Sequence, residues 1–81
     1  MTTAALSHRD RAILRAVAAG TAELIGGEHP DLLVGGRCCC DQMAAHRLAE
    51  AGLIAGTVPA TLGQRVPARL TSAGHLELRA A

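Results

Sequence analysis

The spacing of apolar and polar positions between residues 41 and 52 predicts an amphipathic helix, and residues 53 and 54 then begin a strand. At about 100° per residue, one side of this helix collects Asp41, Ala44, Ala45, Leu48 and Gly52. The other side and its flanks collect Gln42, Met43, His46, Arg47 and Glu50. Glycine is the residue with which helices commonly stop in the left-handed conformation, so we expect the helix to end at Gly52. Its buried side is small and its polar side faces outward.

Helical spacing also marks the N-terminal part of the chain. Ser7 followed by Asp10 is typical of a helix start, because the hydroxyl can cap a backbone N–H and an acid suits the first turn. The following positions recur at helical spacing: Ile13, Leu14, Val17, Thr21, Leu24 and Ile25. We expect one helix from about Ser7 to Ile25, which tolerates Gly20 at about 1 kcal/mol and stops at the two glycines that follow.

Shorter apolar runs predict strands. Residues 32–34 form one, and the next two glycines indicate either a tight hairpin turn or a loop into the helix that begins near Cys40. Residues 53–58 form a second, and residues 59–63 a turn. Residues 64–70 alternate strictly, with Val66, Ala68 and Leu70 on one face.

Pro67 limits how the last predicted strand can pair, and the residues after the strand begin a helix. Pro67 cannot donate a ladder hydrogen bond, so we expect its strand at a sheet edge or paired on the other side. Thr71 or Ser72 then caps a final short helix that carries Leu76 and Leu78.

The composition of the chain narrows the range of possible functions. Eighty-one residues suffice for one domain, which we expect at 7–81 after a flexible segment 1–6. The chain has no Phe, Tyr or Trp, which argues against a module that stacks unpaired bases. Eight Arg against seven acids leave a formal charge of +1, too balanced to predict nucleic-acid binding by itself. With no membrane-spanning run and no signal peptide, we expect a cytoplasmic protein with reduced cysteines and no membrane contact.

The run Cys38-Cys39-Cys40 suggests a metal site with His29 or His46 as a further ligand. Adjacent side chains diverge, however, and zinc sites prefer cysteines two to four residues apart. We therefore predict that the cysteines pack in the fold and that the chain holds no metal or other cofactor. Cys40 is expected to be the most reactive thiol, because helix N-termini lower thiol pKa.

The sequence also lacks the motifs of an enzyme. No Gly-rich phosphate loop and no nucleophile–base pair with discernible context is present, so we predict no catalytic residues and no enzyme.

Two motifs carry a resemblance to a known family. Residues 48–54 (LAEAGLI) are followed, after a hairpin-length segment, by residues 69–74 (RLTSAG). This pair resembles winged helix-turn-helix domains of small bacterial regulators of the multiple-antibiotic-resistance (MarR) type. In that group the first motif ends the recognition helix and the second follows the wing. The resemblance implies an α+β fold ordered helix, short strand, recognition helix, two-stranded wing and short C-terminal helix.

The resemblance also implies candidate contacts and a function. The outward recognition-helix positions are Gln42, Met43, His46 and Arg47, and the wing tip falls on Gln64 and Arg65. Gln and Arg are the side chains that pair with adenine and guanine edges. We expect a sequence-specific double-stranded DNA-binding protein, a bacterial transcriptional regulator that acts as a homodimer on two half-sites. The alternative is a winged-helix docking module with a protein partner and no DNA binding.

Overall fold

The computed structural model of the chain describes residues 6–39 and 41–79, in three helices and five strands. In chain order these elements are α1 (His8–Ala18), β1 (Ala22–Ile25), β2 (Asp31–Val34), β3 (Arg37–Cys38), α2 (Gln42–Glu50), β4 (Ile54–Gly56), β5 (Arg65–Leu70) and α3 (Ser72–Arg79). None of these helices is both long and apolar enough to cross a membrane. Of the segment expected to be flexible, residues 1–5 lie outside the described residues.

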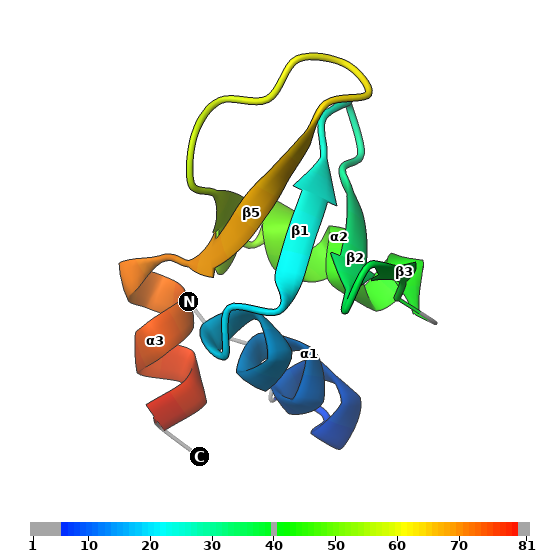
Figure 1. Ribbon diagram of the computed structural model, residues 1–81. Coiled ribbons are helices and arrows are strands. Elements are labelled where there is room, and N and C mark those ends of the chain that lie inside the picture. Colours follow the sequence, from blue (N-terminus) through cyan, green and yellow to red (C-terminus); the bar gives the residue numbers. More distant parts are fainter. Residues whose placement is uncertain (1–5, 40, 80–81) are drawn as a thin grey trace.

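The strands form one antiparallel sheet in the order β3-β2-β1-β5-β4. Figure 1 shows α2 behind this sheet, with α1 and α3 beside its lower end. The core between these layers is aliphatic, and Leu14 and Leu32 are its largest fully buried side chains. The chain is thus a small α+β domain, as the sequence predicts.

The single helix expected over residues 7–25 is wrong. The start is confirmed, because the Ser7 hydroxyl accepts from the Asp10 N–H at 3.0 Å and Asp10 accepts from the Ser7 N–H in return. The helix ends at Ala18, however, and Gly20 turns the chain with a φ of +81°. Residues 22–25 form β1, whose neighbours are β2 and β5. Backbone pairing with β2 and β5 therefore decides the conformation of Leu24 and Ile25, although their spacing in the sequence is helical.

The two glycines at 35 and 36 form the tight hairpin turn and not the loop. Their φ values are +61° and +81°, and a type I′ turn in a two-residue hairpin loop requires a positive φ at both central residues. Val34 and Arg37 pair across this turn, which adds the two-residue strand β3 to the sheet. A β-hairpin therefore occupies the chain between β1 and α2.

The predicted helix around residue 45 is confirmed. Asp41 caps it by accepting from the Ala44 N–H at 2.9 Å, and Gly52 follows it with a φ of +77°. The small apolar side is buried as expected, through Ala44, Ala45 and Leu48.

The last two strands and the final helix are confirmed as well, although the strand expected over residues 53–58 covers only Ile54–Gly56. Val66, Ala68 and Leu70 are buried while the residues between them are exposed. Of the two alternatives expected for the Pro67 strand, the sheet edge is wrong, because β5 lies between β1 and β4, and pairing on the other side of Pro67 is found with β1. Pro67 fits there because its carbonyl accepts from Thr57, just beyond the end of β4, so its missing N–H does not face β1. Thr71 caps α3 by accepting from the Gly74 N–H.

Candidate interaction surfaces

The amide of Gln42 is fully engaged inside the molecule. Its Oε1 accepts from the Leu32 N–H at 2.9 Å, and its Nε2 donates to the Leu32 carbonyl at 2.9 Å and to the Cys39 carbonyl at 3.0 Å. The side chain therefore ties the first turn of α2 to β2. Contact with a base edge would break these bonds.

Arg47 also has a partner within the chain. Its guanidinium donates to Asp10 Oδ1 at 2.7 Å, which joins α2 to the buried capping carboxylate of α1. Burial raises the pKa of Asp10, but hydrogen bonds from Arg47 and from Ser7 outweigh it and hold that pKa below its usual value. The same contact raises the pKa of Arg47.

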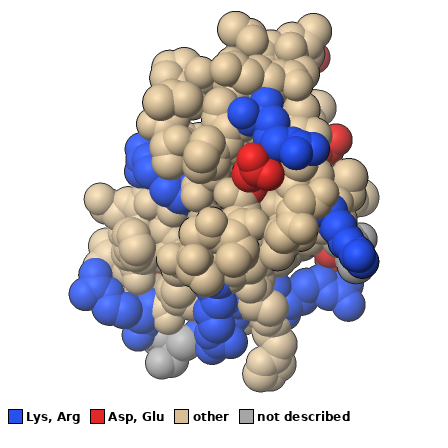
Figure 2. Space-filling model, in the orientation of Figure 1, with Lys and Arg blue, Asp and Glu red and all other residues tan. Residues whose placement is uncertain are grey.

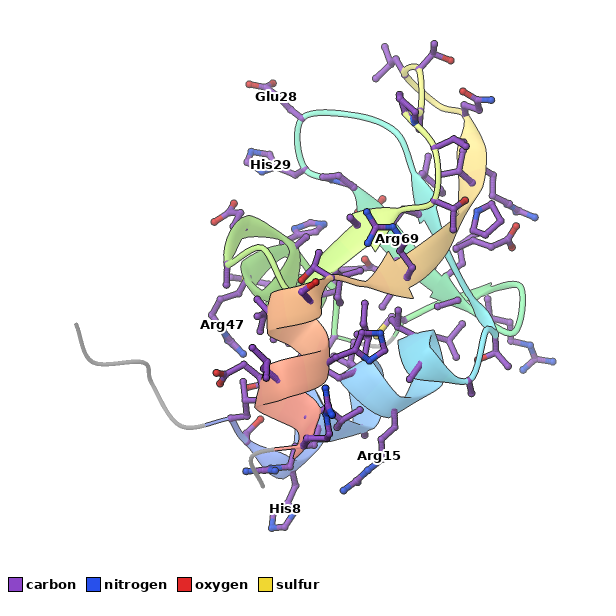
Figure 3. The ribbon with its side chains drawn as sticks, turned by 90° about the vertical axis from the view of Figure 1, so that its left-hand side faces the viewer. His8, Arg15, Glu28, His29, Arg47 and Arg69 are labelled. Carbon is purple, nitrogen blue, oxygen red and sulfur yellow. The ribbon has the colours of Figure 1, made fainter. Side chains whose placement is uncertain are left out.

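The second half of α2 faces the loop between β1 and β2. His46 Nε2 lies 2.9 Å from Asp31 Oδ1, and His29 Nδ1 lies 3.6 Å from Glu50 Oε1. The two imidazole rings are 6.0 Å apart between centroids. Figure 3 shows Glu28 and His29 on their loop above α2, with Arg47 below the helix.

These side chains border a depression of about 300 Å³, which we call the acidic groove. It is lined by Glu28, His29, Pro30, His46, Ala49, Glu50 and Ile54. Two carboxylates and no arginine line it, so it is unfavourable to a phosphate backbone. The sequence analysis named His29 only as a possible metal ligand and missed Glu28 and Asp31, because only the fold brings the β1–β2 loop and the start of β2 next to the helix.

The loop between β4 and β5 is held in place by hydrogen bonds and carries no charged side chain. Gln64 Oε1 accepts from the Thr61 N–H at 3.0 Å, and Gly63 and Gly26 are joined by a backbone hydrogen bond of 2.9 Å. A Cβ on Gly26 would collide with the Thr61 carbonyl, so glycine permits the loop to lie there. Val58 is 53% exposed and Leu62 89% exposed, which makes the loop surface apolar.

Of the six predicted DNA contacts, four are hydrogen-bonded within the chain: Gln42, His46, Arg47 and Gln64. The other two project more freely. Met43 is 81% exposed, and Arg65 approaches only the half-buried Glu23, at 4.0 Å. Among these six residues, only Arg65 therefore offers a loosely paired charge to a ligand.

Arginine side chains gather elsewhere. Figure 2 shows them along the lower end of the molecule, where Figure 1 places α1 and α3. These helices carry Arg9, Arg11, Arg15 and Arg79. The upper loops in that view are almost free of blue side chains.

The cysteines lie at the other end of α2. Cys38 is exposed and Cys39 half-buried, and both are free thiols. Cys40, expected to be the most reactive, lies outside the described residues. Within residues 6–39 and 41–79, no group of three or more Cys, His, Asp or Glu is arranged to hold a metal ion.

Comparison of the chain with models of protein families, with curated proteins and with solved structures gave no match. The class supported by the fold and these surfaces is therefore a small α+β domain with a five-stranded antiparallel sheet.

Proposed function

We propose that the chain is a protein-docking domain on a winged-helix-like scaffold, and that its partner binds at the acidic groove. The arrangement of α1, α2 and the strand order β1-β5-β4 support the scaffold. The observation that carries docking is the charge of the surface that the second half of α2 shares with the β1–β2 loop. Glu28 and Glu50 border the groove, while Arg47 is neutralised by Asp10.

The chemistry of the surface defines the partner. Pro30 also lines a neighbouring depression of about 430 Å³ under the β4–β5 loop, whose lining is apolar apart from Thr57 and Arg69. Carboxylates at one end suit Lys or Arg, and the exposed Val58 and Leu62 near the other suit aliphatic side chains. The partner is therefore a protein segment that combines basic and aliphatic residues.

Two short peptides test this proposal, one of alternating Arg and Leu and one of alternating Glu and Leu. Calorimetric titration should show binding of the Arg–Leu peptide and none of the Glu–Leu peptide. Glu50→Gln should weaken binding about tenfold, equivalent to about 1.4 kcal/mol. Glu77→Gln is the matched control, since Glu77 lies on α3 outside the groove, and should leave binding unchanged. Equal binding of the two peptides, or equal effects of the two variants, would contradict docking at the groove.

DNA binding is the second candidate, favoured by the position of α2 immediately before the β4–β5 hairpin. A domain with one such helix and hairpin would act as a homodimer on two half-sites. Titration of duplex DNA at two salt concentrations distinguishes the candidates, because Arg65→Ala should then flatten the salt dependence. Absence of duplex binding at about 50 mM salt would exclude this candidate.

A further inference from the structure

A larger depression opens at the N-terminal end of α2, between α1 and the β2–β3 hairpin. Its volume is about 500 Å³, within the range of small-molecule sites. We call it the arginine-rimmed cavity. Its lining residues are Arg9, Ala12, Ile13, Ala16, Val34, Arg37, Cys38, Cys39 and Asp41. It shares no residue with the acidic groove.

The walls of this cavity are aliphatic. Ala12, Ile13 and Ala16 contribute from α1, and Val34 contributes from β2. No Phe, Tyr, Trp or His lines the cavity, so its walls offer no aromatic ring to a flat ligand. The walls therefore favour a flexible hydrocarbon body over a planar one.

The charged groups of the cavity leave an excess of positive charge. Arg9 donates to Asp41 at 3.1 Å, and the Ala44 N–H and Arg9 together hold the pKa of Asp41 below its usual value. Asp41 is therefore an ionised group that already has partners. Arg37 also lines the cavity, and among the described residues it has no ion-pair partner. Its guanidinium is available to an anionic group.

We propose that the arginine-rimmed cavity binds a small aliphatic carboxylate, with the hydrocarbon chain against α1 and Val34 and the carboxylate on Arg37. A guanidinium presents parallel N–H groups that match the two oxygens of a carboxylate. The walls come from α1 and a hydrogen-bonded hairpin, so they are in place before the ligand arrives. This site is independent of docking at the acidic groove.

Three probes of equal length and different charge test the site: octanoate, 1-octanol and octylammonium. Calorimetric titration should rank them in that order of affinity, with octanoate about tenfold tighter than the alcohol. Arg37→Gln should lower octanoate to the affinity of the alcohol while the alcohol is unchanged. Ala12→Leu, at an exposed position of the wall, should abolish binding of both. Arg15→Gln removes an arginine of α1 that does not line the cavity, and should change neither.

Several results would overturn the proposal. One is equal affinity for the acid and the alcohol, which would remove the role of Arg37. Another is no saturable octanoate binding up to about 1 mM. A third is a dimer in sedimentation that Ala12→Leu dissociates, because a second copy of the chain would then fill the cavity. Circular dichroism of each variant verifies that it is folded.

Discussion

The first turn of α2 is joined to its neighbours by hydrogen bonds to backbone atoms, whereas its last turns meet theirs only through side chains. Gln42 makes three such bonds, to Leu32 and to Cys39. At the other end, His29 and Glu50 form a pair of 3.6 Å with both side chains about two-thirds exposed. The arginine-rimmed cavity at the first end therefore has fixed walls, while the side chains of the acidic groove at the second can adapt to a partner. Fixed walls and adaptable side chains therefore lie at opposite ends of one helix.

Gln42→Ala should have the largest effect on folding stability, because it removes the bonds that fix the first turn of α2. The substitution leaves the buried N–H of Leu32 without its side-chain partner, at about 1–3 kcal/mol, while the Leu32 carbonyl keeps the hydrogen bond from the Cys39 N–H. Urea unfolding should show this loss as a lower midpoint. Gln64→Ala is the matched control, because the hydrogen bonds of Gln64 are exposed and their loss should cost much less. Unchanged stability of Gln42→Ala, together with altered preference at one DNA base pair, would instead support the base contact expected from the sequence.

Local signals predicted most of the fold. Asp41 caps the start of α2, although the sequence analysis placed it within the helix on the buried side. Gly52 marks the end of α2, and the strict alternation of Val66, Ala68 and Leu70 marks β5. The Ser7–Asp10 capping box also lies within four residues. Each of these signals depends on neighbours in the chain, so the sequence alone displays it.

The missed features depend on distant partners. Leu24 and Ile25 continue the helical spacing of α1, and only pairing with β2 and β5 makes them a strand. Asp10 and Arg47 are 37 positions apart, so no spacing rule joins them. For the same reason Gln42 resembled a free base contact in the sequence, and Glu28 was not identified as part of a site.

Asp10→Asn should have a smaller effect, and one that depends on pH. The folded-state pKa of Asp10 is lowered, so its ionised form stabilises the fold above the unfolded-state pKa of about 3.9. That stabilisation is lost as the pH falls through the folded-state value. Near neutral pH the variant should be less stable by about 1 kcal/mol, and the difference should shrink below about pH 4. Urea midpoints measured from pH 7 to pH 2 would check this, and a difference that does not vary with pH would contradict the ion pair.

Glu50→Gln should have the smallest effect on stability. Among the described residues the ion-pair partner of Glu50 is His29, and both side chains are exposed. Exposed ion pairs contribute little because water screens them. The urea midpoint at neutral pH should stay within error of the unsubstituted chain, although the same variant weakens binding of the Arg–Leu peptide. A fall in stability comparable to that of Gln42→Ala would mean that the groove wall belongs to the folded framework. The two ends of α2 would then not differ, and the groove would no longer be the adaptable surface that docking of a basic segment requires.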